Sequence, residues 1–249
     1  MKLKYDLHIH SCLSPCGSDD AAPGDIAGFC KLAGLDVAAL ADHNSSRNCP
    51  AFLEAAADYG LLAIPAMELT TAEEVHILCL LPDPESAEQL EGFVSSRLPP
   101  GDNIPEVFGN QLVMDADGRV LSRERRLLTG AADIGVYQVA ELVSSLGGLA
   151  IPAHIDRSSY SVLSNLGFLT PDMGFSLVEL SRRAQIPELL RRNPELAGLP
   201  YLVNSDAHRL SDIHDASFEL EVEEPSPRGV LEALRQGRGL PRLGETERL

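Results

Sequence analysis

The sequence of 249 residues contains no tryptophan and few aromatic residues of any kind, 5% in total. Only three of its 20 basic residues are lysines, and 37 acidic residues bring the formal net charge to −17. Such a balance does not supply the broad positive surface that long nucleic acids bind, and aromatic stacking platforms are scarce. We therefore expect polymeric nucleic acid not to be a partner, whereas a small anionic substrate remains compatible.

The chain also lacks long apolar runs, internal repeats and glycine- or serine-rich linkers. No stretch reaches the roughly 18 apolar residues of a membrane span, and the first residues lead into a predicted strand instead of a signal peptide. The five cysteines follow no zinc-knuckle spacing, so we expect reduced thiols. These absences predict a cytoplasmic protein with a single domain over residues 1–249, and they indicate nothing about its oligomeric state.

Short apolar segments alternate with segments of helical character along most of the chain. Strands are predicted over residues 3–9, 35–40, 61–66, 75–81, 148–153, 176–180, 201–204 and 218–222. Helices are predicted between most of them, and the last begins at Pro227 behind an N-cap at Ser226. This alternation indicates an α/β protein whose mainly parallel sheet is covered on both faces. Roughly seven strands favour a closed or nearly closed barrel, with an open doubly wound sheet as the alternative.

The stretch from about residue 99 to 135 interrupts this alternation and is predicted to be an irregular insertion. Within it, residues 111–114 and 119–121 flank a turn that contains Gly118, which is typical of a β-hairpin. We expect the insertion to lie where it could cover a site.

Histidines and carboxylates occur where predicted strands end. His8 and His10 are two residues apart in the first strand, so both imidazoles face the same side. Further candidates at or just after the ends of other strands are His43, Glu68, His154, Asp206 and His208. Loops that follow the strands of a barrel meet at one face, and imidazole is the commonest metal ligand among side chains. The pattern therefore predicts a shared metal site.

Six short motifs resemble those of the PHP family, which is named after polymerase-associated domains and histidinol phosphatases. They are Asp-Leu-His-Ile-His-Ser at 6–11, Ala-Asp-His-Asn at 41–44, Met-Glu at 67–68, Val-His at 75–76, Pro-Ala-His at 152–154 and Asn-Ser-Asp-Ala-His at 204–208. Together they span about residues 5–210 in the family's order. The resemblance implies a distorted (β/α)7 barrel that carries two or three divalent metal ions, variously zinc, manganese or iron, and hydrolyses a phosphoester.

Carried over by position, the resemblance implies three metal sites. The first would be held by His8, His10, Glu68 and Asp206. Glu68 would bridge to a second ion, which His76 and His154 would also bind. His43 and His208 would hold a third ion.

The third site departs from the pattern of many family members, which have a histidine six residues after the second histidine of the first pair, or an acidic residue close by. In this sequence Cys16 stands there, and a thiolate is a good ligand for zinc or iron. The alternatives are that Cys16 is only a loop thiol and the third site is weak or empty, or that Asp19 or Asp20 takes its place.

The mechanism implied by these residues is the attack of a metal-bridging hydroxide on phosphorus, because bound metal lowers the pKa of water towards roughly 7. Asp42 is a candidate catalytic residue that orients a ligand or carries a proton; the alternative is a buried carboxylate bonded only to backbone. Arg157 is a candidate for catalysis and substrate binding, and Arg182 and Arg183 are candidates for binding the substrate phosphate.

These expectations favour a metal-dependent phosphoesterase that hydrolyses a small phosphorylated metabolite or a nucleotide. A phosphatase of amino-acid biosynthesis or a protein phosphatase of the same family is the enzymatic alternative. An alternative from another class is a regulatory module without turnover that responds to metal or redox state through Cys12 and Cys16.

Overall fold

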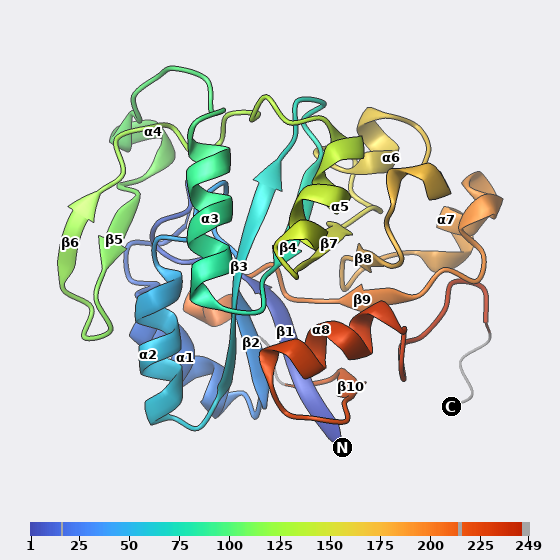
Figure 1. Cartoon of the computed structure of the whole chain (residues 1–249), viewed down its shortest axis with the longest axis horizontal. Helices are drawn as coiled ribbons and strands as arrows, with labels where there is room; N and C mark the ends of the chain where they lie inside the picture. The colour runs from blue at the N-terminus through green and yellow to red at the C-terminus, as the bar shows by residue number, and fades with distance from the viewer. Residues whose placement is uncertain (16, 214–215, 246–249) are drawn as a thin grey trace.

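The computed structural model describes residues 1–15, 17–213 and 216–245. Strands and helices alternate along most of the chain, which confirms the predicted α/β class (Figure 1). The strands are β1 (Lys2–Ile9), β2 (Val37–Leu40), β3 (Leu62–Thr70), β4 (His76–Leu80), β5 (Leu112–Met114), β6 (Val120–Arg123), β7 (Leu149–Pro152), β8 (Val178–Leu180), β9 (Tyr201–Val203) and β10 (Glu219–Glu221). The α-helices are α1 (Pro23–Leu32), α2 (Cys49–Asp58), α3 (Pro84–Ser95), α4 (Pro105–Phe108), α5 (Val136–Ser145), α6 (Val162–Asn165), α7 (Ile186–Arg192) and α8 (Pro227–Arg235). Short 3-10 helices cover Pro171–Met173, Pro194–Leu196 and Leu210–Asp212.

Six strands form one mixed sheet in the order β10-β1-β2-β3-β4-β7. The β1–β2 and β2–β3 pairs are parallel, whereas β1–β10, β3–β4 and β4–β7 are antiparallel. The prediction of a mainly parallel sheet is therefore wrong, because β4 and β10 run opposite to their neighbours. A closed seven-stranded barrel is not confirmed, since within the described ranges β8 and β9 form a separate parallel pair beside an open sheet.

Apolar side chains bury both faces of the sheet. Ile26 of α1 and Phe52 of α2 pack with Leu40 of β2 in one cluster, and all three are fully or almost fully buried. A second cluster joins Leu7 of β1 to side chains of β9 and α8 on the other side. Burial of a side chain such as Phe52 contributes about 1.5–3 kcal/mol. Both clusters include side chains of β1, which carries His8 and ends just before His10.

The antiparallel strands bring Glu68, His76 and His154 to the same end of the sheet. β3 is longer than predicted and contains Glu68 near its end. β4 begins at His76, and the register pairs His76 with Thr70 of β3. β7 runs antiparallel to β4, so the end of β7, which His154 follows, lies next to the start of β4. The start of β4 therefore lies next to the ends of β3 and β7, beside Glu68.

The insertion at residues 99–135 contains the predicted hairpin, β5–β6, together with the short helix α4. The hairpin lies beside α2 in Figure 1. Its following loop is tied to the sheet by Asn44, whose Nδ2 donates to the carbonyl oxygens of Leu128 and Gly130 at 2.8 and 2.9 Å. The insertion is thereby held against the end of the sheet where the histidines gather.

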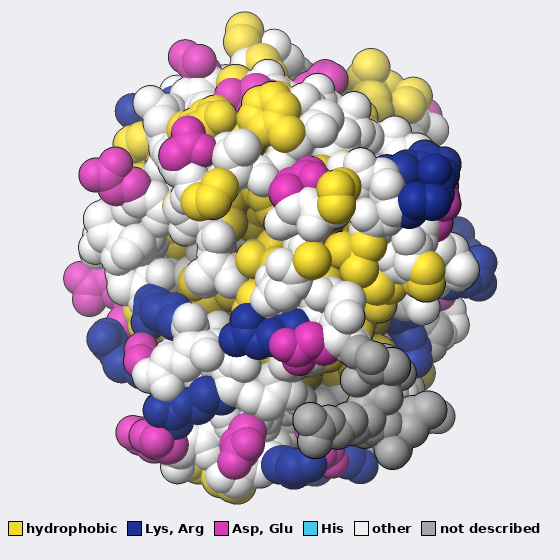
Figure 2. Space-filling view, turned by 90° about the vertical axis from the view of Figure 1, so that its right-hand side faces the viewer, with side chains coloured by type: hydrophobic (Ala, Val, Ile, Leu, Met, Phe, Trp, Pro, Cys, Tyr) yellow, Lys and Arg dark blue, Asp and Glu magenta, His cyan; other side chains and the backbone are white. Residues whose placement is uncertain are grey.

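The face of the molecule seen in Figure 2 shows basic and acidic side chains interspersed around a central group of hydrophobic ones. Among the residues drawn in colour, no histidine is visible on this face. In the part of the chain that the structure describes, no helix combines the length and apolar character needed to cross a bilayer.

Candidate metal centre

His8 is fully buried and held by a carboxylate from another strand. Both oxygens of Glu179, in β8, lie 3.0 Å from Nδ1 of His8. The positive charge of His8 outweighs the effect of burial and keeps the pKa of Glu179 below its ordinary value. An ionised carboxylate can only accept, so Nδ1 of His8 carries the proton. In the neutral imidazole that a metal ion requires, Nε2 then carries the lone pair and points away from Glu179.

His10 is held in the same tautomer by different groups. The hydroxyl of Ser14 donates to Oδ1 of Asp42 at 2.7 Å, and the same Oγ lies 2.8 Å from Nδ1 of His10. A hydroxyl has one proton, and Ser14 gives it to the carboxylate, so Ser14 must accept from Nδ1 of His10. In the neutral form of His10, Nε2 therefore also carries the lone pair.

The Nε2 atoms of His8 and His10 face each other. Nε2 of His8 and Nε2 of His10 are 3.1 Å apart, and in the neutral forms of both rings neither nitrogen has a proton to donate to the other. Oxygens of Glu68 and Asp206 lie 3.0 to 3.5 Å from these nitrogens. Donors bound at about 2.1 Å to one tetrahedral ion would be about 3.4 Å apart. The donor set and its spacing thus fit a divalent metal ion.

Without such an ion, protons must balance the buried carboxylates. Burial alone would lower the pKa of His10, but Asp206 and Glu68 raise it to about 9. Burial would raise the pKa of Glu68, yet the neighbouring imidazoles hold it well below its ordinary value. The buried carboxylates therefore need positive charge beside them. A metal ion would supply that charge when it displaces the protons.

Glu68 contacts imidazoles with both oxygens. His76 Nδ1 and His154 Nε2 lie 3.0 and 3.1 Å from Oε1, and His43 Nδ1 lies 2.9 Å from Oε2. The described residues contain three groups with converging donor atoms: His8, His10, Glu68 and Asp206; His43, Glu68 and His76; and His10, His43 and His208. The first group is the set that the resemblance implies. The other two place His43 next to Glu68 and His10 next to His208, while Cys16 lies outside the described residues.

Strained backbone gathers around this cluster. His154, Asp206, Asn44 and Tyr160 have positive φ angles of 31°, 52°, 50° and 55°. Residues other than glycine rarely adopt a positive φ, and for bulky residues this conformation is strained. Such residues concentrate at functional sites, where surrounding contacts impose the conformation.

Glu179 is the residue that sequence reasoning missed. Besides His8, it accepts from the backbone N–H of His154 at 3.0 Å and from Nδ2 of Asn204 at 2.6 Å. It is almost fully buried in β8. A carboxylate alone in the apolar run Leu177–Leu180 is a signal that could have identified it, because a buried charge needs partners.

Among the described residues, the carboxylate of Asp42 forms no hydrogen bond with a side chain of the donor cluster, although its backbone carbonyl oxygen accepts from the N–H of Glu68 at 3.1 Å. Its oxygens accept from the N–H and the hydroxyl of Ser11 at 2.7 and 2.6 Å, in addition to Ser14. The N–H of His43 donates to the same Ser14 hydroxyl at 3.1 Å. The geometry allows Asp42 to orient His10 through Ser14.

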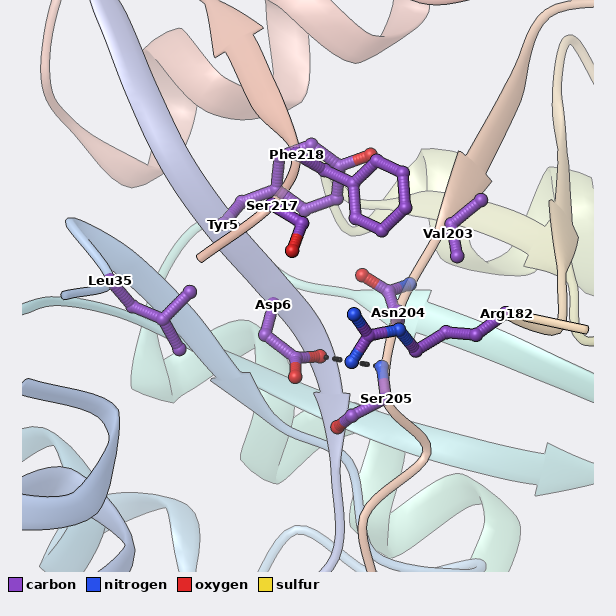
Figure 3. Close-up of a pocket in the computed structure, with 9 residues that line it drawn as sticks. All are labelled: Tyr5, Asp6, Leu35, Arg182, Val203, Asn204, Ser205, Ser217 and Phe218. Carbon is purple, nitrogen blue, oxygen red and sulfur yellow. Dashed lines mark hydrogen bonds between the residues drawn. The ribbon is translucent and has the colours of Figure 1, made fainter. Parts of the chain in front are cut away.

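The three candidate arginines occupy different places. Nη2 of Arg157 lies 2.5 Å from Oδ2 of Asp206, at the edge of the cluster. Arg182 extends past Asn204, and its guanidinium points towards Asp6 (Figure 3). The space enclosed there is about 10 Å³, enough for about one water molecule. Arg182 and Arg183 also line a larger cavity.

Two cavities open beside the donor cluster and share His154, Arg157 and Asp206. One, of about 340 Å³, is also lined by Arg182 and Arg183. The other, of about 290 Å³, reaches Thr129 and Tyr160. Arg157 therefore stands where both cavities meet the candidate metal site.

Comparisons with known proteins agree with this arrangement. A family model described as PHP-associated matches residues 191–238. The lesion-specific endonuclease PfuEndoQ from Pyrococcus furiosus shares the fold with a TM-score of 0.69 and 20% identity over 97% of this chain. This chain spans 58% of the length of that endonuclease. A protein provisionally described as a metal-dependent phosphoesterase from Bifidobacterium adolescentis gives a TM-score of 0.55 and 18% identity over 93% of this chain and 94% of its own. No curated protein sequence matches the chain.

One of these structures overturns the expectation about nucleic acid. Endonuclease Q in complex with a 27-mer duplex that carries an abasic lesion aligns over 97% of this chain and 58% of that chain, with 19% identity and a TM-score of 0.67. The expectation that polymeric nucleic acid is not a partner is wrong, because net charge describes the whole surface, whereas binding depends on local charge. Here Arg157, Arg182 and Arg183 gather beside the donor cluster. The family match and the shared fold together confirm the resemblance to the PHP family that the six motifs predicted.

Proposed function

We propose that this chain is a metal-dependent phosphoesterase that acts on a phosphorylated small metabolite or a nucleotide, with two or three ions of zinc, manganese or iron. The observation that carries the proposal is the pair of opposed Nε2 atoms of His8 and His10, 3.1 Å apart and flanked by the carboxylates of Glu68 and Asp206. Ions bound there would make water nucleophilic near neutral pH and neutralise charge on the phosphoryl oxygens.

The residues around the cluster have separable roles in this proposal. Glu68 would be shared between two metal positions, because it belongs to two of the donor groups: its oxygens lie 3.3 and 3.4 Å from Nε2 of His10 and His8, and 2.9 and 3.0 Å from Nδ1 of His43 and His76. Asp42 would be a positioning residue that acts on His10 through Ser14. Arg157 would exchange its contact with Asp206 for a phosphate, since a guanidinium binds phosphate oxygens in a bidentate manner. Arg182 and Arg183 would bind anionic groups in the adjoining cavity.

The structure gives less support to a redox-responsive module that uses Cys12. This thiol is buried and contacts the carbonyl oxygen of Leu112 at 3.6 Å. Burial, with the nearby carboxylates of Asp42 and Asp19, raises the pKa of Cys12 to about 12. Redox-sensing cysteines react as thiolates, so a buried thiol of this kind is a poor sensor.

The test is a metal-reconstitution assay. The protein is stripped with a chelator, reloaded with Mn²⁺, Zn²⁺ or Fe²⁺, and assayed on phosphomonoesters, bis(4-nitrophenyl) phosphate and a DNA duplex with an abasic site. We expect hydrolysis only after reloading. Glu68→Gln should lose both metal and activity, whereas Glu188→Gln, which changes an exposed carboxylate on α7, should keep both. Equal rates in the stripped and reloaded protein, or full activity in Glu68→Gln, would refute the proposal.

A further inference from the structure

Tyr160 lies against the donor cluster without contributing a metal-binding atom. Its ring stacks on the imidazole of His76, with ring centroids 4.7 Å apart and an interplanar angle of 22°. Its carbonyl oxygen accepts a hydrogen bond of 2.9 Å from the backbone N–H of His76. Both ends of the residue are therefore fixed to the strand that carries His76.

The conformation of Tyr160 is a costly one that its surroundings maintain. A φ of 55° is unusual for a bulky side chain. The next residue, Ser161, donates its hydroxyl to the carbonyl oxygen of Arg157 at 2.8 Å and caps α6 by accepting from the N–H of Ser164 at 3.1 Å. These bonds close the loop between Arg157 and α6, and the closed loop presents the tyrosine ring at the rim of the site.

The cavity of about 290 Å³ next to the cluster has few lining residues that are not candidate ligands. They are Thr129 from the insertion, Arg157 and Tyr160. Tyr160 is 46% exposed although His76 covers one side of its ring, so much of the remaining ring surface is open. The cavity therefore has a cationic group, a hydroxyl and an aromatic surface within reach of the donor cluster, and its size is close to that of small-ligand sites.

We propose that Tyr160 is a specificity-determining residue that stacks on a planar ring of the substrate, so that the site prefers phosphoesters of nucleosides over those of simple sugars. The proposal rests on the proposed function and names the substrate class of the same site. Arg157 would hold the phosphate while the nucleobase covers the open side of the tyrosine ring. Every base offers a π-face, so the preference should depend little on which base is present. The aromatic surface at this site was not expected from a sequence with so few aromatic residues.

The experiment compares two ligands that differ only in the base. Adenosine 5′-monophosphate and ribose 5-phosphate have the same phosphorylated hydroxymethyl group, so the ratio of their affinities isolates the contribution of the ring. Binding to the Mn²⁺-loaded protein is measured by calorimetry, and hydrolysis is measured separately as kcat/KM. A change in metal content affects both ligands, so the ratio within one variant does not depend on it.

Three variants make the test specific. Tyr160→Leu removes the aromatic ring, Tyr160→Phe keeps it, and Tyr137→Leu removes an equally exposed tyrosine of α5 outside the cavity. We expect the wild-type protein to bind the nucleotide roughly tenfold more tightly than the sugar phosphate. Tyr160→Leu should abolish that ratio, while Tyr160→Phe and Tyr137→Leu should retain it.

The outcomes separate the two proposals. Equal affinities for both ligands in the wild-type protein, or an unchanged ratio in Tyr160→Leu, would overturn the role of Tyr160 even if the protein hydrolyses phosphoesters. A ratio that depends on Tyr160 without hydrolysis of any phosphoester would support the stacking site and overturn the proposed catalytic function.

Discussion

Both oxygens of the Glu179 carboxylate lie 3.0 Å from Nδ1 of His8. The two residues are 171 positions apart in the sequence and meet because β8 approaches the end of β1. A carboxylate behind a metal-binding imidazole fixes its tautomer and its orientation. Glu179 would therefore orient His8 for metal binding although it does not belong to the donor cluster.

Glu179→Gln should lower metal affinity by roughly 10- to 100-fold, the usual cost of losing such an outer partner. The glutamine amide can donate to Nδ1 of His8, which would move the imidazole proton to Nε2 and remove the lone pair. Competition with a chromophoric chelator measures the affinity. Glu188→Gln is the control because Glu188 is exposed and pairs only with Arg191 and Arg192 among the described residues. An unchanged affinity in Glu179→Gln would show that His8 needs no such partner.

Metal removal should make the stability of the protein depend on pH. In the metal-free protein the pKa of His10 is raised from 6.5 to about 9. A raised histidine pKa stabilises the folded state fully below the unfolded value, and that contribution is lost as pH rises through 9. The free energy of unfolding of the stripped protein should therefore fall between about pH 6.5 and 9. The metal-loaded protein should show a flatter profile in urea titrations, and similar slopes for both forms would argue against protons replacing the metal.

Metal binding should also release protons near pH 7. His10 is largely protonated at this pH in the absence of metal, and a ligand must be deprotonated. Calorimetric titrations in buffers with different ionisation enthalpies count the released protons. Zero release at pH 7, with substantial metal binding, would contradict the protonation state inferred for the metal-free site.

Asn44 should hold the loop at residues 128–132 in its folded position. Its side chain is fully buried, donates to two carbonyl oxygens of the loop and accepts from the N–H of Thr70 at 2.8 Å. Asn44→Gly tolerates the φ of 50° and removes only these bonds. We expect a loss of about 1–3 kcal/mol in the free energy of unfolding and faster amide exchange at residues 128–132.

The control for Asn44 is an exposed residue with a similar bonding pattern. Nδ2 of Asn165 donates to the carbonyl oxygens of Glu73 and Glu74 at 3.0 and 2.9 Å. Water can replace these bonds, so Asn165→Ala should cost less than Asn44→Gly. If amide exchange at residues 128–132 is the same in Asn44→Gly and the wild-type protein, the loop is held by other contacts.

Substitution of Arg157 should lower kcat/KM without lowering the metal content. Arg157→Lys keeps a positive charge beside Asp206 but loses the planar fork that binds phosphate. We expect kcat/KM to fall by roughly 100-fold, as when one donor to a transition-state oxygen is removed, with metal content unchanged. Arg191→Lys, on the exposed side of α7, should leave kcat/KM unaltered. A loss of metal that parallels the loss of rate would assign Arg157 to the metal site instead.

Much of the fold could be predicted from local patterns. The helix that begins at Pro227 behind the Ser226 cap forms as expected, with the Ser226 hydroxyl accepting from the N–H of Gly229. The hairpin around Gly118 also forms where the turn signal placed it. Both follow from short-range chemistry, because caps and tight turns depend on residues within a few positions of one another.

The direction of the strands could not be predicted in this way. An apolar strand such as β4 has the same pattern whether it runs parallel or antiparallel to β3, and only packing decides between them. The antiparallel choice is what places His76 next to Glu68. The sequence alone identified His76 as a candidate ligand through a resemblance, without the geometric reason for its position.

The sequence by itself determined the chemical types that can meet at the site, since the histidines and carboxylates at the strand ends were visible in it. Only the tertiary structure decided the tautomers of His8 and His10, the role of Glu179 and the exposure of Tyr160. These depend on contacts between residues far apart in the chain, such as Glu179 with His8 and Tyr160 with His76. Local periodicity contains no information about which distant hydrogen-bond acceptor a buried imidazole will find, because that pairing is fixed only when the strands pack.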